Sequence, residues 1–412
     1  MNRRRVVITG LGAVTPLGLN VTSYWQGLLE GRSGIREIEA FDACEYTSRI
    51  AGEVRGFSAG DYFDTRLVKR LDRFAQFALA CALEAVEDAG IDFAEEDPRR
   101  IGTLIGSGIG GLAEIEEQHT RLMERGPGKL SPFMVPKLMM NAAAGQISIY
   151  FGLRGPSMAI ASACASATNS LGEAAAVVAR GDAEVMLAGG SEAATTPLGL
   201  GGFCALKALS TRNDDPEHAS RPFDRDRDGF VLGEGAAVAV LEEYEHAKAR
   251  GAKIYAEFAG YGASDDAYHL TAPDPQATGA SEAMENALRN AGLSPGDITY
   301  INAHGTATEF NDVMETDAIK KVFGAHAKKL VISSTKSMTG HLLGASGAVE
   351  LVACALAIRQ GVVPGTMNLD HPDPKCDLDY AANAAREMEV KVALSNSFGF
   401  GGHNACLVLK KA

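Results

Sequence analysis

The chain carries the same succession of segments twice, and this internal repetition constrains its fold more than any other feature. Apolar runs that end in glycines open the two halves, at residues 6–12 and 254–262. After an insertion, each run is followed by an amphipathic helical pattern. The patterns close at residues 82–91 and 287–293, and both end in alanine, glycine and an apolar residue. A glycine just past a periodic run is the expected end of a helix. The repetition therefore predicts two structurally related halves.

Three further strand patterns recur in each half. In the first half they cover residues 101–105, 158–163 and 184–188, and in the second 298–302, 330–334 and 390–395. The middle strand of each set feeds a long alanine-rich helix, residues 164–180 and 341–360. Strands that alternate with helices predict a parallel-dominated sheet with helices on its faces. We therefore predict an α/β fold with two pseudo-duplicated halves, residues 1–252 and 253–412.

Several residues suited to chemistry stand just past the ends of these strands. They are Cys164, His304, the segment from Lys336 to His341, and the glycine loop around Phe400. Ligands of α/β proteins collect at the carboxyl ends of the strands. We therefore expect one cysteine, two histidines and one lysine to meet there as a nucleophile with polarising partners.

Cys164 is the predicted nucleophile because an apolar strand turns into a helix at this residue. A thiol at a helix N-terminus is stabilised as the thiolate by free N–H groups and the helix dipole. The placement predicts a thiol pKa lowered from about 8.5 towards the range of about 3.5–7.5. A small buried core residue is the alternative interpretation, and it suits the other six cysteines.

Composition excludes several classes of protein. A net charge of −13 over 412 residues argues against a nucleic-acid-binding protein, which needs a basic surface. The seven cysteines are scattered and form no CxxC pair, so neither a disulfide framework nor a zinc ribbon is indicated. No stretch was expected to reach the 18 or more apolar residues of a membrane span. These features predict a cytoplasmic protein.

Three motifs point to other functions, and each fails on one requirement. Residues 106–111 match the GxGxxG pattern of dinucleotide-binding loops, but no acidic strand end follows about 20 residues later. Residues 224–229 resemble a calcium loop, but position 235 is glycine where glutamate is required. A salt-bridged turn is predicted there instead. His403 and Cys406 are too few ligands for a metal.

Taken together, the motifs resemble those of the elongating β-ketoacyl-acyl carrier protein synthases, of the synthase II kind. The matching segments are residues 10–16 (GLGAVTP), 162–164 (SAC), 221–231 (RPFDRDRDGFV), 302–306 (NAHGT), 336–341 (KSMTGH) and 396–402 (NSFGFGG). The resemblance covers essentially the whole chain. It implies the thiolase-like fold, with five αβαβα layers built from two related halves, and usually a homodimer.

The resemblance also implies the reaction, a decarboxylative Claisen condensation in fatty acid elongation. An acyl carrier protein delivers an acyl chain to Cys164, and malonyl-carrier then loses CO2 to give the attacking carbanion. His304 and His341 would donate hydrogen bonds to the malonyl thioester oxygen, and Lys336 would organise the site by pairing with Glu350. Substrates arrive on the phosphopantetheine of the carrier, and no other cofactor is expected.

Further roles follow from the resemblance. The backbone N–H groups of Cys164 and Phe400 would form an oxyanion hole, and Phe400 would also gate the acyl pocket. The substrate would contact Thr271, Thr306 and Thr308 in the phosphopantetheine channel, Ile109 and Phe203 in the acyl tunnel, and Phe398. The acidic carrier would dock on Arg66, Lys69, Arg70, Lys129 and Lys207. Relatives also place a structural monovalent cation near positions matching Asn302, Glu350, Ser395 and Asn396, although no metal is required for catalysis.

Other interpretations remain open at this point. A ketosynthase of a polyketide or another specialised acyl pathway would use the same residues, so sequence motifs do not separate it from a fatty acid enzyme. Thiolases use a second catalytic cysteine, and neither Cys376 nor Cys406 has a suitable setting. A non-condensing chain-length-factor partner typically lacks the nucleophile that is present here as Cys164.

Overall fold

The structure is a computed structural model that describes residues 4–412. Its main strands form one ten-stranded sheet, which consists of two five-stranded groups with the same topology. The order β5-β4-β6-β7-β1 in the first half matches β10-β9-β13-β14-β8 in the second. Among residues 4–412, strands of the two groups pair with each other only at β1 and β8, Val7 with Glu257 and Ile8 with Ala256. The predicted α/β fold with two duplicated halves is thus confirmed. The predicted parallel-dominated sheet is wrong, because β7 and β14 run antiparallel to both of their neighbours, which leaves four parallel and five antiparallel strand pairs among the described residues.

The elements of the sheet and the helices against it follow one plan in both halves. The first half contains β1 (Val6–Val14), α3 (Arg73–Ala89), β4 (Ile101–Gly106), β5 (Ser157–Ile160), α7 (Ser166–Arg180), β6 (Val185–Glu192) and β7 (Gly235–Glu243). The second contains β8 (Ala256–Asp265), α10 (Thr278–Ala291), β9 (Tyr300–Asn302), α11 (Glu309–Phe323), β10 (Val331–Ser333), α13 (Ser346–Gln360), β13 (Val392–Gly399) and β14 (His403–Lys410).

The remaining elements lie outside this repeated arrangement. They are α1 (Val21–Leu29), α2 (Thr65–Val68), α4 (Leu112–Arg125), α5 (Met134–Leu138), α6 (Ala142–Phe151), α8 (Pro197–Ala205), α9 (Tyr244–Ala249) and α12 (Lys336–Thr339). Two short ribbons pair β2 (Arg36–Glu37) with β3 (Ile50–Ala51) and β11 (Val362–Val363) with β12 (Arg386–Glu387). The predicted division after residue 252 falls between α9 and β8, and the boundary itself stays a prediction.

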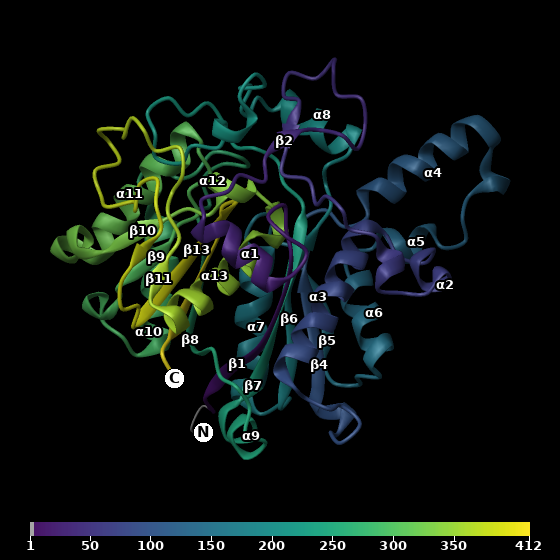
Figure 1. Ribbon diagram of the computed structural model, residues 1–412, viewed down its shortest axis with the longest axis horizontal. Coiled ribbons are helices and arrows are strands. Elements are labelled where there is room, and N and C mark those ends of the chain that lie inside the picture. Colours follow the sequence, from purple (N-terminus) through teal and green to yellow (C-terminus); the bar gives the residue numbers. More distant parts are fainter. Residues whose placement is uncertain (1–3) are drawn as a thin grey trace.

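Five layers cross the molecule from left to right in Figure 1. Helices α10 and α11 lie outside β9 and β13, α13 and α7 fill the centre, and α3 and α6 lie outside the first-half strands. Three large apolar clusters fill the spaces between these layers. The central cluster is built on α7 and α13, which are almost wholly buried. The carboxyl ends of strands from both halves therefore meet around the same pair of central helices.

Glycines bring the outer helices close to the first strand of each half. A Cβ at Gly12 would lie 2.0 Å from the Cys81 carbonyl oxygen of α3. A Cβ at Gly262 would likewise lie 2.2 Å from the Ala283 carbonyl oxygen of α10. Such distances leave no space for any side chain. The glycines that end both apolar runs therefore serve the same close helix–strand packing in each half.

Two predicted helix starts are wrong, in both cases because the backbone leaves the helical region first. Helix α7 begins at Ser166, since Ala163 has a φ of 49°. Helix α13 begins at Ser346 and not at His341, since Gly340 and Leu343 have φ values of 72° and 48°. Both Cys164 and His341 consequently lie in loops that lead into the central helices.

One stretch does reach the length and apolar character of a membrane span, contrary to expectation. Residues 343–360 form an 18-residue stretch, of which 89% is buried inside the protein. A mostly buried apolar helix of this kind is typical of a protein core. The stretch contains α13, and its apolar surface is already covered by the layers around it.

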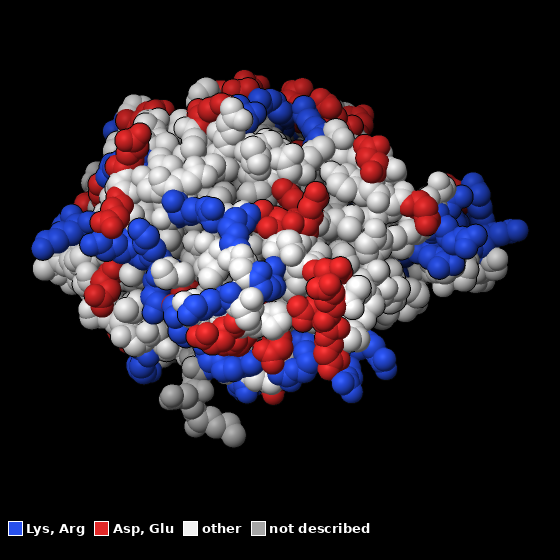
Figure 2. Space-filling model, turned by 60° about the horizontal axis from the view of Figure 1, so that its bottom comes forward, with Lys and Arg blue, Asp and Glu red and all other residues white. Residues whose placement is uncertain are grey.

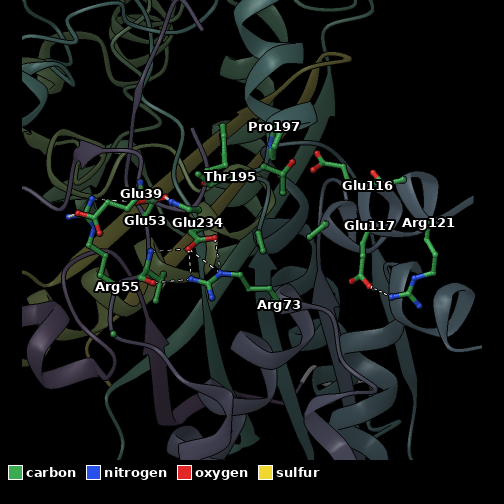
Figure 3. Close-up of a pocket in the computed structure, with 18 of the residues that line it drawn as sticks. Glu39, Glu53, Arg55, Arg73, Glu116, Glu117, Arg121, Thr195, Pro197 and Glu234 are labelled. Atoms are coloured by element: carbon green, nitrogen blue, oxygen red, sulfur yellow. Dashed lines mark hydrogen bonds and ion pairs between the residues drawn. The ribbon is translucent and has the colours of Figure 1, made fainter. Parts of the chain in front are cut away.

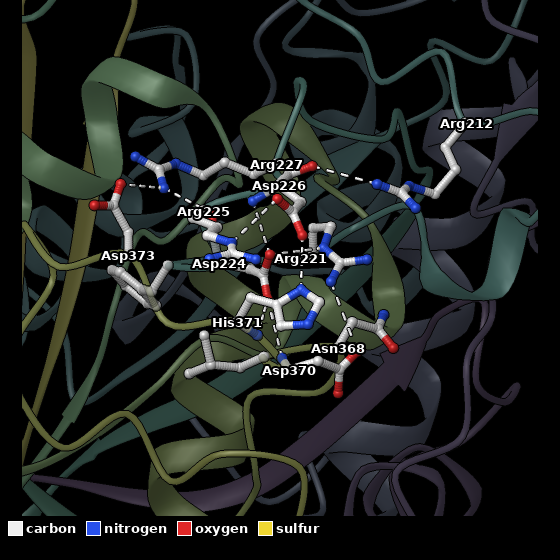
Figure 4. A network of polar contacts seen from close by, with 12 residues as sticks. Arg212, Arg221, Asp224, Arg225, Asp226, Arg227, Asn368, Asp370, His371 and Asp373 are labelled. Carbon is white, nitrogen blue, oxygen red and sulfur yellow. Dashed lines mark hydrogen bonds and ion pairs between the residues drawn. The ribbon is translucent and has the colours of Figure 1, made fainter.

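The predicted salt-bridged turn at residues 224–229 is confirmed (Figure 4). Asp224 pairs with Arg221 at 3.1 Å, and Arg227 pairs with Asp373 at 2.8 Å. Asp226 lies 2.7 Å from His371. The charged side chains of this turn are therefore joined in a network of ion pairs.

Candidate active site

Cys164 lies in a tight turn between β5 and α7, held by side chains of α7. Ser166 accepts a hydrogen bond from the backbone N–H of Ser162 at 2.9 Å and donates one to the Ala163 carbonyl at 2.6 Å. The Asn169 amide donates to the Ser162 hydroxyl at 2.5 Å. These contacts stabilise the left-handed conformation of Ala163, which is costly for a residue with a Cβ.

The thiol of Cys164 contacts a histidine from the second half of the chain. His341 Nε2 lies 3.0 Å from the Cys164 Sγ, and His341 Nδ1 lies 2.9 Å from the Ser346 hydroxyl. The rings of His304 and His341 stand nearly perpendicular, with centroids 5.3 Å apart. The predicted meeting of these three residues is therefore present, and all three are buried.

Burial sets the protonation state of the site. It raises the pKa of the Cys164 thiol to about 11, against the lowering effects of the Lys336 charge and of hydrogen bonds from the Phe400 and Cys164 backbone N–H groups. The predicted lowering of this pKa is thus wrong, because the thiol is desolvated and lies before the helix. Burial, reinforced by Lys336, lowers the pKa of His304 and His341 well below the usual range. The resting site therefore contains a neutral thiol and two neutral imidazoles.

A serine hydroxyl gives His341 access to both of its neutral tautomers. If Nδ1–H donates to Ser346, then Nε2 is free to accept the thiol proton; if the Ser346 hydroxyl donates to Nδ1, then Nε2–H is a donor. A hydroxyl serves in either role because its hydrogen rotates. The same imidazole can therefore act first as a base and later as a hydrogen-bond donor.

Buried acidic residues position Lys336 and the loop that carries His304. Lys336 forms an ion pair with Glu350 of α13, as the sequence predicted, and both side chains are buried. Glu315 of α11 accepts hydrogen bonds from the backbone N–H groups of His304 and Gly305, both at 2.8 Å. The Nδ1 atom of His304 is buried without a hydrogen-bond partner in the structure. Its ring orientation is set by the backbone and by packing against Phe398, at a centroid distance of 5.8 Å.

A pocket of about 570 Å³ opens onto this cluster. Its walls include the predicted substrate-contacting residues and one predicted docking residue: Ile109, Phe203, Lys207, Thr271, Thr306, Thr308, Phe398 and Phe400. The hydroxyls of Thr306 and Thr308 lie 3.0 Å apart on the same wall. Cys164, His304 and His341 line the pocket as well. His403, by contrast, is exposed at the start of β14.

A second hollow, of about 930 Å³, lies between α4, α8 and the loops around residues 39–41 and 53–56 (Figure 3). Several of its charged side chains are paired with one another. Arg73 binds Glu234 at 2.7 Å, and Arg121 binds Glu117 at 2.6 Å. No cysteine or histidine is among the lining residues. The smaller pocket is therefore the candidate active site.

The residues expected near a structural cation share an unusual property. Each has a buried side-chain oxygen without a hydrogen-bond partner: Asn302 Oδ1, Glu350 Oε2, Ser395 Oγ and Asn396 Oδ1. Buried oxygens of this kind are almost always paired. Carboxylate, amide and hydroxyl oxygens suit a hard cation. The residues present therefore fit such an ion.

The predicted docking residues are all exposed but do not form one cluster. Arg66, Lys69 and Arg70 lie on or just after α2, and Lys129 follows α4, on the right of Figure 1. Figure 2 shows basic side chains gathered on the lobe at this edge. Arg70 stacks over the Phe133 ring at 5.4 Å. Lys207 stands apart from the other four, at the pocket.

Comparison with known proteins agrees with this site. The chain belongs to the β-ketoacyl synthase family: the family's N-terminal domain matches residues 3–247 and its C-terminal domain residues 255–370. It is therefore an acyltransferase, and the predicted family and enzyme class are confirmed.

Individual relatives narrow this class. The chain is 53% identical over 411 residues to a 3-oxoacyl-[acyl-carrier-protein] synthase 2 of Coxiella burnetii, covering 100% of this chain and 99% of that protein. A protein of the same description from Synechocystis is 52% identical with the same coverage. These relatives support an elongating synthase of the second type.

Solved structures show the same fold. A type II polyketide ketosynthase, in complex with its acyl-carrier protein, has a TM-score of 0.93 and 37% identity, covering 100% of both chains. A β-ketoacyl synthase from Burkholderia phymatum has a TM-score of 0.92 and 37% identity, covering 99% of this chain and 100% of that one.

Three polar residues of the site were missed from the sequence, namely Glu192, Glu315 and Ser346. Glu192 is the last residue of β6. Its position at the carboxyl end of an apolar strand could have identified it as a site residue. Glu315 lies within α11 and Ser346 begins α13. Their helical positions gave no indication that they contact the histidine segments.

Proposed function

We propose that the chain lengthens an acyl chain by decarboxylative condensation of acyl-carrier with malonyl-carrier, in fatty acid elongation. The observation that carries the proposal is the 3.0 Å contact between Cys164 Sγ and His341 Nε2, with His304 beside it in the 570 Å³ pocket. A thiol with an adjacent base is suited to acyl transfer. Two neutral histidines beside it are suited to stabilising an enolate.

In the first step, the thiol proton passes to His341 Nε2 while Sγ attacks the carbonyl carbon of the acyl thioester. The backbone N–H groups of Cys164 and Phe400, which act on the sulfur in the resting site, would stabilise the developing oxyanion. The thioester C–S bond then breaks. The phosphopantetheine thiolate leaves with the proton from His341, and the acyl group stays on Cys164.

Between the two steps, His341 exchanges its remaining proton with solvent and then holds it on Nε2. In the second step, the malonyl thioester oxygen accepts hydrogen bonds from His304 and from His341. The bond to the carboxylate breaks, CO2 leaves, and its electron pair forms an enolate. Each preorganised donor contributes about 2.7–4 kcal/mol to such a transition state. The enolate carbon then attacks the acyl carbonyl, and the Cys164 thiolate leaves and takes up one proton from solvent, which balances the negative charge of the malonyl carboxylate lost as CO2.

The Lys336–Glu350 ion pair has an electrostatic role in this proposal. Burial and, after it, the Lys336 charge lower the pKa of both histidines, so that both remain neutral hydrogen-bond donors. A monovalent cation held by Asn302, Glu350, Ser395 and Asn396 would fix the buried oxygens behind that pair. When bound, it supplies positive charge to hold the ligand loops in place, and it takes no part in the bond changes.

The partners are proposed on separate grounds. An acyl carrier protein is supported by the basic lobe and by the polyketide neighbour, which was solved with its carrier. A homodimer is supported by the exposed edge strand β5 and the apolar side chains beside it. All seven cysteines are free, which suits a cytoplasmic location.

A ketosynthase of a polyketide pathway is the second candidate, favoured by the likeness to the polyketide neighbour. Its 37% identity is well below the 53% shared with the Coxiella synthase, so we favour fatty acid elongation.

Two variants separate the steps. Cys164→Ala should abolish condensation of acyl-carrier with malonyl-carrier, because no acyl-enzyme can form. His304→Ala should leave acylation of Cys164 intact but reduce malonyl decarboxylation about 100-fold or more, as expected for loss of one oxyanion donor. Mass spectrometry of the protein and release of labelled CO2 measure the two steps. Condensation by Cys164→Ala, or an unchanged decarboxylation rate in His304→Ala, would contradict the assignment.

A further inference from the structure

The backbone N–H groups of the loop after β4 are bound to a carboxylate of the protein itself. Glu192, at the end of β6, is fully buried. Its Oε2 accepts from the Gly108 N–H at 2.8 Å and the Gly344 N–H at 3.0 Å. Its Oε1 accepts from the Ile109 N–H at 3.2 Å and the Ser107 hydroxyl at 2.9 Å. Four donors thus surround one buried anion, which offsets its loss of hydration.

This arrangement explains the GxGxxG pattern of residues 106–111. In dinucleotide-binding loops the N–H groups of such a pattern face a pyrophosphate. Here the Glu192 carboxylate occupies them. A Cβ at Gly108 would lie 2.9 Å from Glu192 Oε2, and one at Gly344 would lie 2.6 Å from the same atom. The glycines therefore allow the backbone to approach an internal anion.

The carboxylate connects two segments that line the active-site pocket from different halves of the fold. Ile109 lines the pocket on the first-half side. Leu343, in a strained left-handed conformation with a φ of 48°, lines it on the second-half side, immediately before Gly344. A Cβ at Gly108 would also lie 3.5 Å from the Ala163 carbonyl oxygen, next to the nucleophile. Glu192 thus fixes the pocket wall relative to Cys164.

We propose that Glu192 is a positioning residue that sets acyl-chain selectivity, by holding Ile109 and the Leu343–Gly344 segment at fixed places in the pocket wall. The inference rests on the proposed function, because it requires an acyl chain on Cys164. A long chain must pass and pack against this wall, whereas a very short chain leaves it largely untouched. The malonyl group reacts at the histidines and does not need the wall.

Glu192→Gln tests the proposal with almost no change of shape. An amide retains only one acceptor oxygen, so its NH2 group must face N–H donors. It is accommodated best at the Oε1 position, where Ser107 can rotate to accept, but Ile109 N–H then loses its partner. We expect the rate of Cys164 acylation by long-chain acyl-carrier (14–16 carbons) to fall about tenfold. Acylation by four-carbon acyl-carrier and malonyl decarboxylation should stay within twofold. Amide hydrogen exchange should accelerate at residue 109, which loses its acceptor, and should change less at residues 108 and 344, which keep theirs.

Glu242→Gln is the matched control, since Glu242 is an equally buried carboxylate bound to Arg250, His246 and Thr9. It should not alter the ratio of long-chain to short-chain acylation, whatever its effect on stability. An unchanged ratio in Glu192→Gln, or an equal fall at every chain length, would overturn this inference and leave the proposed function intact. If the unaltered protein is not acylated at Cys164 by any acyl-carrier, the proposed function and this inference are both overturned.

Discussion

At the scale of single residues, the site combines an unreactive resting nucleophile with a base that is already in contact with it. The sequence identified Cys164, His304, His341 and Lys336, because each follows a strand end. It gave the wrong protonation state for Cys164, since the effect of a helix N-terminus is visible in sequence but desolvation is not. Burial dominates here, so the thiolate has to be formed during the reaction and is not stored beforehand.

The raised pKa of Cys164 predicts a distinctive pH dependence of its alkylation. Only the thiolate reacts with iodoacetamide, and below a pKa of about 11 its fraction increases tenfold per pH unit. We therefore expect the labelling rate of Cys164 to keep rising between pH 7 and pH 10. Peptide mass spectrometry measures this rate. Exposed Cys44 provides an internal reference for reagent access. A plateau of the Cys164 rate below pH 8 would show that the thiolate is stored in the resting protein.

At the scale of elements, the repeated strand–helix pattern predicted most of the frame, because its apolar and glycine periodicities were regular. The predicted starts of α7 and α13 were wrong because residues with positive φ precede both helices. Nothing in the sequence indicates that Ala163 and Leu343 adopt this conformation. The antiparallel strand β7 was also missed, although its residues are all buried. Its partners β1 and β6 are distant in sequence, so only the assembled sheet reveals its role.

The contact between α3 and β1 predicts a strong dependence on Gly12. In Gly12→Ala the new methyl group would lie 2.0 Å from the Cys81 carbonyl oxygen, so strand and helix must separate. We expect the free energy of unfolding in urea to fall by about 1–3 kcal/mol. Gly202→Ala on α8 is the control, since nothing lies within 4 Å of its Cβ position. It should stabilise by about 0.5–1 kcal/mol through helix propensity. Equal stability of the two variants would contradict this account of the packing.

At the scale of the whole molecule, the duplicated fold ends on two sheet edges, β5 and β10. Strand β10 is largely buried, whereas Met158 of β5 is 44% exposed. Helix α6 packs beside β5 and exposes 74% of Ile149, and α5 next to it exposes Val135. An edge strand flanked by apolar side chains is a site for association. Because β5 leads directly into Cys164, association there would also brace the loop of the nucleophile.

This surface predicts a dimer that a single charge can weaken. We expect the unaltered chain to sediment at twice its mass of 43.3 kDa, and Ile149→Asp to shift it towards the monomer at micromolar concentration. The reason is that burying an unpaired carboxylate at an apolar interface costs several kcal/mol. Leu270→Asp is the control, since Leu270 is 76% exposed but lies on the loop after β8 and is not part of β5, α5 or α6. Its sedimentation should match that of the unaltered chain. A monomeric unaltered chain, or the same shift in both variants, would rule out β5 and α6 as the interface.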